Sequence, residues 1–141
     1  MSEQIFDYGR YLLAVLGTMA NFIFGGWDAA LQILILFVVL DYFTGLMAAY
    51  FKKELSSDIG RRGIAKKILI FVLIAIAAML DRVGIIGEPV FRTLACWFYI
   101  GNEGLSIIEN AAYVGLPIPE PLKNALNNIK GKGTKQPGQE T

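Results

Sequence analysis

Residues 29–51 read AALQILILFVVLDYFTGLMAAYF, and this stretch decides the fold class of the chain. Gln32, Asp41 and Thr44 interrupt an otherwise apolar run. At about 1.5 Å per residue, a helix over this range covers the hydrocarbon core of a bilayer, which is about 30 Å thick. Trp27 precedes the run, at a position where an indole ring meets the lipid headgroups, and we assign it to the interface. The segment therefore predicts a transmembrane helix.

The composition of the whole chain also favours a membrane location. Of 141 residues, 55% are hydrophobic and 18% are charged, and the mean hydropathy is +0.50. A soluble domain of this length needs fewer apolar residues to fill its core. The net charge of +1 gives no support to a nucleic-acid partner. There is no histidine, and the single cysteine, Cys96, is interpreted as an apolar filler, so no metal site and no cofactor are predicted.

Two more helices are predicted after the first span, at about 64–87 and 89–116. The first contains an unbroken apolar stretch at 68–80 and returns across the bilayer. The second begins at Pro89 and stops before the proline cluster at 117–121. It is less hydrophobic and amphipathic, so it is either a third span or a helix lying in the interface.

The predicted fold class is an all-α integral membrane protein, a helical bundle with three transmembrane helices and one further helix at the amino terminus. Residues 1–26 form that further helix, which is apolar from 11 to 26 but short. It is either a fourth span or a helix in the interface. Residues 27–122 form the transmembrane domain, and residues 123–141 are predicted to be a basic, flexible tail.

Positive residues predict the orientation. The connection at 52–67 carries six lysines and arginines against Glu54 and Asp58, so the positive-inside rule places this loop and the carboxyl terminus in the cytoplasm. The loop is also a candidate for binding anionic headgroups. At the opposite interface, Asp81 and Arg82 are either a gate or a satisfied interfacial pair. The residues expected to determine topology are Lys52, Lys53, Arg61, Arg62, Lys66 and Lys67, the last two by snorkelling to the interface.

Asp41 lies in the middle of the first predicted span. An ionisable group there costs about 2.5–3.5 kcal/mol on insertion scales, so it should not face lipid. With Thr44, Gly45 and Ala48 it forms a small and polar stripe at helical spacing. This stripe either lines a pore and drives self-association, or it holds one bundle together through a single carboxyl.

A second polar stripe runs along the last predicted helix. If several copies assemble, we expect it to face a shared water-filled lumen; if the helix is interfacial, the stripe faces ordinary solvent. The residues of this stripe are Asn102, Glu103, Ser106, Glu109 and Asn110.

Several short motifs follow one another along the chain. They are Asp41-Tyr42-Phe43-Thr44-Gly45, then Ser56-Ser57 with Gly60, Gly63, Lys66 and Lys67, then Asp81, then Asn102-Glu103-Gly104-Leu105-Ser106-Ile107-Ile108-Glu109-Asn110, and finally Gly115-Leu116-Pro117-Ile118-Pro119. In this order and spacing they resemble the toxin secretion/phage lysis holin family, over about residues 28–126. The resemblance implies a protein that oligomerises in the cytoplasmic membrane and opens lesions through which an endolysin or a toxin leaves.

The leading hypothesis is therefore a holin whose partners are other copies of itself and the bilayer, with an endolysin or toxin as cargo that makes no stable contact. Two alternatives stay open, namely an antiholin or membrane adaptor that regulates a holin, and a subunit of a small ion channel or transporter. No nucleophile elbow, phosphate loop or acid–base pair is present in the sequence, so an enzyme is not predicted.

Overall fold

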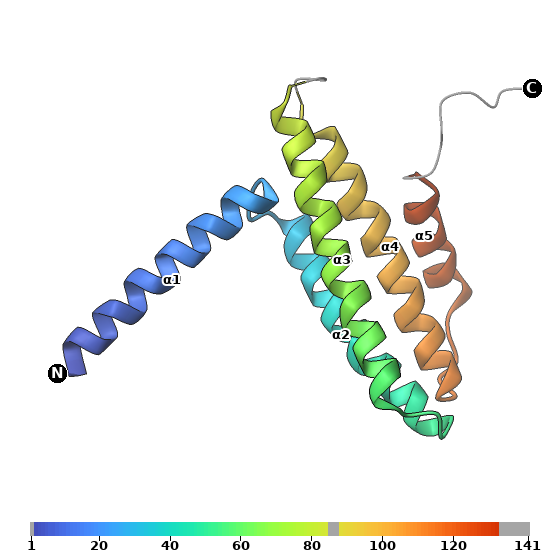
Figure 1. The fold of residues 1–141 in the computed structure, drawn as a ribbon. Coiled ribbons are helices and arrows are strands. Elements are labelled where there is room, and N and C mark those ends of the chain that lie inside the picture. The colour runs from blue at the N-terminus through green and yellow to red at the C-terminus, as the bar shows by residue number, and fades with distance from the viewer. Residues whose placement is uncertain (1, 85–87, 133–141) are drawn as a thin grey trace, which may run out of the picture.

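The computed structural model describes residues 2–84 and 88–132, and in this part of the chain every regular element is a helix. Figure 1 shows the helices in chain order. They are α1 (Ser2–Phe24), α2 (Ala29–Phe51), α3 (Ser57–Arg82), α4 (Val90–Tyr113) and α5 (Glu120–Lys132). The all-α prediction is confirmed for the described residues.

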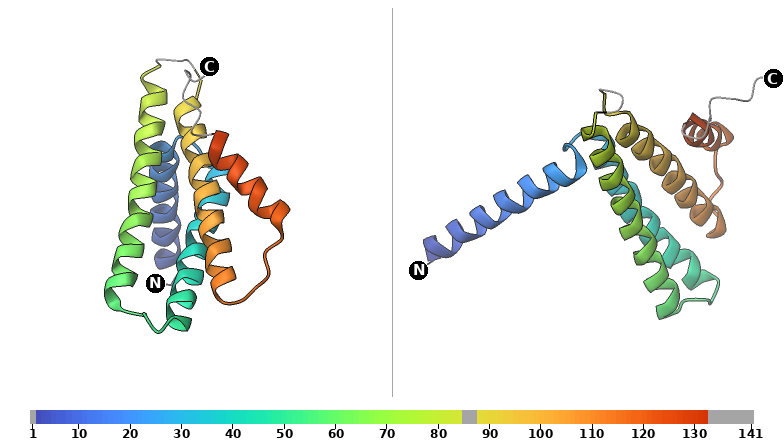
Figure 2. Two further views of the ribbon diagram at one scale, coloured as in Figure 1. Left: turned by 90° about the vertical axis from the view of Figure 1, so that its right-hand side faces the viewer. Right: turned by 45° about the horizontal axis from the view of Figure 1, so that its top comes forward.

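Helices α2, α3 and α4 lie side by side, and in the view of Figure 1 they run down, up and down again (Figure 1 and Figure 2). This gives the bundle two ends, which we name after residues that lie there. The Arg92 end holds the start of α2, the end of α3 and the start of α4. The Lys52 end holds the three opposite termini.

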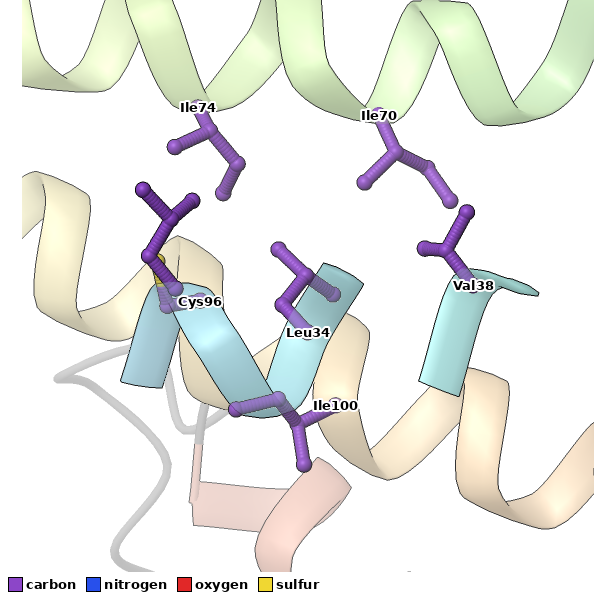
Figure 3. Close-up of a cluster of buried hydrophobic side chains, with 7 residues drawn as sticks. Leu34, Val38, Ile70, Ile74, Cys96 and Ile100 are labelled. Atoms are coloured by element: carbon purple, nitrogen blue, oxygen red, sulfur yellow. The ribbon is translucent and has the colours of Figure 1, made fainter. Parts of the chain in front are cut away.

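The core of the bundle is small and apolar. Figure 3 labels six of its side chains, which come from all three helices: Leu34, Val38, Ile70, Ile74, Cys96 and Ile100. Ile70 and Ile74 on α3 point toward Val38 and Leu34 on α2. Leu34, Ile74 and Cys96 are fully buried. Cys96 therefore fills apolar space, as the sequence indicates.

Large apolar side chains also cover the outside of the bundle. Leu36 and Phe43 on α2 are 54% and 63% exposed, and Leu69 and Ile76 on α3 are 59% and 50% exposed. Such a surface needs an apolar solvent. Among the described residues, α2 and α3 are long and apolar enough to span a membrane. The third span, over α4, stays a prediction.

Helix α3 begins at Ser57, seven residues before the predicted start, so most of the predicted basic loop is helical. The side chain of Ser56 accepts a hydrogen bond from the backbone N–H of Ile59 and caps the helix. The prediction took the apolar run as the limit of the helix, although polar turns can extend a membrane helix into water. At the other end α3 stops at Arg82, before Gly84 with its positive φ of 77°. The remaining predicted residues, 85–87, lie outside the described part.

The flexible tail prediction is wrong for residues 123–132, which belong to α5 and pack along α4. Pro121 occupies the first turn of α5, where proline is tolerated. Gly104 lets α5 approach closely, since a Cβ at this position would lie 2.9 Å from the side chain of Leu126. The rest of the predicted tail, residues 133–141, falls outside the described residues.

Helix α1 leaves the bundle at the Arg92 end and projects away from α2, α3 and α4 (Figure 2). Its side chains are exposed along nearly its whole length. The prediction of an amino-terminal helix is confirmed, while its relation to the membrane stays open.

Candidate functional site

Three charged side chains meet inside the bundle, one from each of its helices. The ammonium of Lys67 on α3 donates hydrogen bonds to the carboxylates of Asp41 on α2 and Glu103 on α4. The side chains of Lys67, Asp41 and Glu103 are 16%, 10% and 4% exposed in that order. We call Asp41, Lys67 and Glu103 the buried ion cluster.

The buried ion cluster lies at one depth. Each of its members is ten residues from the terminus of its helix at the Lys52 end, at Phe51, Ser57 and Tyr113 respectively. At about 1.5 Å per residue this is about 15 Å from that end. If the bundle spans a bilayer, the charges therefore lie well within the hydrocarbon.

Neutral polar groups complete the bonding of Asp41. The side-chain amide of Asn110 donates to Asp41 Oδ1 at 3.1 Å and to Thr44 Oγ1 at 3.1 Å. The hydroxyl of Thr44 in turn donates to the backbone carbonyl of Asp41 at 3.2 Å. Within the described residues, no buried side-chain nitrogen or oxygen lacks a hydrogen-bond partner. A single chain thus satisfies these groups without a second copy.

The structure divides the predicted polar stripe of α4. Glu103 and Asn110 point at α2 and α3, whereas Glu109 is exposed. On α2, Ala48 is buried with Asp41, and Gly45 lies close to Asn110, since a Cβ there would be 3.6 Å from the amide nitrogen. The stripe of α2 is therefore covered by α4 within one molecule.

Lys67 has a role that the sequence analysis missed, because the ammonium bonds inside the bundle instead of snorkelling to the interface. The signal was present in the spacing, since Lys67, Ile70 and Ile74 share one face of α3 and both isoleucines are in the core.

The other predicted topology residues lie on the surface at the Lys52 end. Lys52 caps α2, and its ammonium lies 3.4 Å from the ring centroid of Tyr113. Lys53 takes a positive φ of 58° in the turn that follows. Arg61 pairs with Asp58 at an exposed site. A surface pair of this kind contributes little to stability.

A groove opens beside the buried ion cluster, with a cavity of about 570 Å³. Asp41, Lys67 and Glu103 contribute to its wall. Its other polar lining residues include Arg62 and Lys66 of α3 and Asn102 and Ser106 of α4. The cluster therefore has one side through which water or another polar group could approach.

A second set of charged side chains, at the Arg92 end, joins α4 to the segment between α1 and α2. Arg92 is buried, and its guanidinium donates to Asp28 Oδ2 at 2.6 Å, to the carbonyl of Gly26 at 3.1 Å and to the carbonyl of Phe24. The hydrogen bond from Arg92 lowers the pKa of Asp28 below its usual range. Sequence analysis missed Arg92, although it shares a helix face with the core residues Cys96 and Ile100 at i+4 and i+8.

Asp81 and Arg82 bond to different partners and not to each other, while the prediction of a gate at this position stays a prediction. The carboxylate of Asp81 accepts from the backbone N–H groups of Phe91 and Arg92, both at 2.9 Å, and so caps α4. Arg82 donates to the backbone carbonyl of Phe22, and its guanidinium carbon lies 4.0 Å from the centroid of the Phe22 ring. Trp27 is 59% exposed between α1 and α2.

Among residues 2–84 and 88–132, no group of three or more histidine, cysteine, aspartate or glutamate side chains is placed to hold a metal ion. What the geometry does provide is a set of charges that fastens helices inside an apolar bundle.

Comparison with known proteins identifies the family of the chain. The model of the bacteriophage holin family matches residues 18–131. The chain belongs to the bacteriophage holin family. This holin-family protein is 35% identical to a probable holin of Bacillus phage phi105 over 101 residues, which cover 71% of this chain and 73% of that protein. The resemblance stated from the motifs is thereby confirmed.

Bacterial relatives of the holin-family protein match even more of its length. A 14.9 kDa protein from the nagH 3′ region of Clostridium perfringens is 49% identical over 130 residues, which cover 92% of this chain and 98% of the relative. The YqxH protein of Bacillus subtilis is 35% identical over 112 residues, which cover 79% of this chain and 78% of the relative. No solved structure matches the chain significantly. Family membership and the two apolar helices indicate a membrane protein with a holin-like role, in a family that is not one of enzymes.

Proposed function

We propose that this holin-family protein assembles in the cytoplasmic membrane into a non-selective lesion, through which an endolysin or a toxin leaves the cell. One observation carries the proposal beyond family membership. The buried ion cluster holds two carboxylates and one ammonium, so it has a net charge of −1 when all three groups are ionised.

Burying such a cluster in lipid costs free energy that its ion pairs offset only in part. Each buried ion loses several kcal/mol of hydration, and Lys67 can offset one carboxylate fully but not two. The bundle is therefore a strained closed form, in which hydrogen bonds hold a surplus negative charge. If copies gather and open a lumen beside the groove, water reaches Asp41 and Glu103, and this cost is relieved.

This mechanism modifies the expectation drawn from the sequence. Assembly is not needed to make Asp41 tolerable, because Lys67 and Asn110 already bond it in one chain. The stripe of α2 is covered by α4, so in this form it is not free for self-association. We place the lumen on the groove side instead, where Asn102 and Ser106 of the predicted stripe lie.

In this proposal α2, α3 and α4 each cross the bilayer, and the bundle has a defined orientation. Helix α4 is paired to α2 and α3 through Glu103 and Asn110, so it crosses the bilayer with them. The Lys52 end, with Arg61, Arg62 and Lys66 on its surface, faces the cytoplasm.

The experiment is to reconstitute the purified protein into liposomes that contain both a small dye and a folded enzyme. A holin releases both once a threshold density is passed. Release of the dye alone would indicate a channel subunit and overturn the proposal. Retention of both at every density, together with an unchanged membrane potential when the chain is expressed alone in bacteria, would indicate an antiholin or adaptor.

A further inference from the structure

We propose that α1 is a membrane-surface helix that lies in the lipid interface at the Arg92 end and does not cross the bilayer. The structure leaves α1 without cover, since Ile5, Phe6 and Leu13 are 66%, 73% and 70% exposed. A helix with so much apolar surface needs a partner, and the distribution of its residues identifies that partner as a lipid surface.

The residues of α1 divide into two arcs. At 100° per residue, the apolar side chains fill a little more than half of the circumference, and the remaining arc is polar or small. The apolar arc contains Ile5, Phe6, Tyr8, Leu12, Leu13, Val15, Leu16, Met19, Phe22 and Ile23. The polar arc contains Glu3, Asp7, Arg10, Ala14, Gly17, Thr18 and Asn21.

Length does not separate a surface helix from a span here, because α1 has 23 residues, as many as α2. The positions of the charged residues do distinguish a surface helix from a span. Glu3, Asp7 and Arg10 lie near the start of α1, and a crossing would place this end in or beyond the far half of the bilayer. Helix α1 is not among the described helices that are apolar enough to span. A polar arc along the whole helix suits a position parallel to the membrane, where one face meets water.

The connection to the bundle fixes where α1 can lie. Its last turn is held by Arg82, through the carbonyl of Phe22, and by Arg92, through the carbonyl of Phe24. Gly25 packs tightly against this anchor, since a Cβ there would lie 3.1 Å from the Arg92 side chain and 3.2 Å from Ala78. From this point α1 extends outward from the side of the bundle (Figure 1), so the anchor fixes the last turn of α1 at the Arg92 end.

The same charges indicate the kind of lipid surface. Glu3, Asp7 and Arg10 sum to −1, so the polar arc offers no basic cluster to anionic headgroups. Binding rests on buried apolar area, and adding an anionic lipid to zwitterionic vesicles should change it little. This inference does not depend on lesion formation.

The test uses single cysteines placed on the two arcs in a Cys96→Ala background of the full chain, reconstituted in phosphatidylcholine vesicles. Leu12→Cys and Leu16→Cys carry a fluorophore on the apolar arc, and Ala14→Cys and Thr18→Cys carry it on the polar arc. Lipids with quenchers at known depth should quench the first pair several-fold more strongly than the second. Vesicles with added phosphatidylglycerol should give the same pattern.

A second measurement fixes the side. Asp7→Cys, on the polar arc, should react with a membrane-impermeant maleimide from the same side as Gly84→Cys, and from the side opposite to Lys53→Cys. Reaction from the Lys53 side would show that α1 spans and would overturn the proposal. So would apolar-arc labels that are neither quenched by lipid nor reactive, because another copy of the chain would then cover them. Neither outcome would bear on enzyme release from liposomes, which tests the proposed function separately.

Discussion

Lys67 on α3 bonds to Asp41 on α2 across 26 residues of sequence, deep within an apolar bundle. The same ammonium bonds Glu103 on α4, so one lysine joins all three helices. Stability and the proposed lesion formation both depend on this arrangement.

Replacing Lys67 with methionine should destabilise the bundle by about 3–5 kcal/mol, because two buried carboxylates lose their counter-ion. Thermal unfolding in detergent measures the effect. Lys66→Met is the matched control, since Lys66 is exposed one residue earlier, and it should behave like the wild type. Adding Glu103→Gln to Lys67→Met should restore part of the stability. Equal melting of the two methionine variants would contradict the role of Lys67.

Replacing Asp41 with leucine should let the protein insert at the normal level but delay or abolish permeabilisation. The change leaves Lys67 paired with Glu103 alone, so the surplus negative charge that favours a wet lumen is gone. Lysis timing in cells, with membrane levels checked by immunoblot, gives the result. Glu109→Gln removes an exposed carboxylate on α4 and should leave the timing unchanged. Normal timing in Asp41→Leu would count against Asp41 as a lumen group.

Replacing Gly104 with valine should cost about 1–3 kcal/mol through overpacking. Even a Cβ would lie 2.9 Å from the Leu126 side chain and 3.1 Å from the Phe37 side chain, so both side chains must shift, and the two methyl groups of valine add to this pressure between α4 and α5. Proteolysis of α5 and thermal unfolding should both report the change. Gly17→Ala is the control, because a Cβ at Gly17 on α1 would meet nothing within 4 Å, and it should be neutral or slightly stabilising.

The Asp28–Arg92 pair should make the folded protein more stable at neutral pH than at acidic pH. The pKa of Asp28 is lowered in the folded protein, so the unfolded chain binds the proton more readily. The contribution is therefore complete above the usual carboxyl pKa of about 3.8 and is lost as the pH falls through the lower folded value.

Asp28→Asn tests this while keeping a good cap for α2. Its melting temperature should lie below that of the wild type at pH 6, and the gap should begin to narrow below about pH 3.8 and close as the pH falls through the lower folded pKa. Asp7→Asn, at an exposed position on α1, should follow the wild type throughout. A gap that stays constant with pH would show that charge is not the cause.

Much of the bundle was predictable because apolar run length and charge placement depend on local sequence. The helix at 29–51 matches α2, and the predicted helix at 89–116 contains α4 (Val90–Tyr113). The start of α3 was not predictable in this way, because its first turns are polar and are stabilised by the Ser56 cap. The packing of α5 depends on Gly104, a contact between two distant segments.

The candidate site was predicted in part for a similar reason. Asp41 and Glu103 stand out because a carboxyl in an apolar helix always needs an explanation. Lys67 does not stand out, since a lysine beside other basic residues resembles a topology signal. Only the meeting of three helices shows that its side chain turns inward. Arg92 was hidden likewise, because its partners are backbone carbonyls and Asp28.

The order of the buried ion cluster along the chain has a consequence for biogenesis. A ribosome delivers Asp41 first, Lys67 second and Glu103 last. Entering alone, α2 would bring an unmatched carboxylate into the translocon, whereas a hairpin of α2 and α3 is already neutral at this depth. The newest helix, α4, then introduces the extra negative charge. A nascent protein truncated before α4 would therefore sit in the bilayer with its ions balanced, and only completed synthesis upsets that balance.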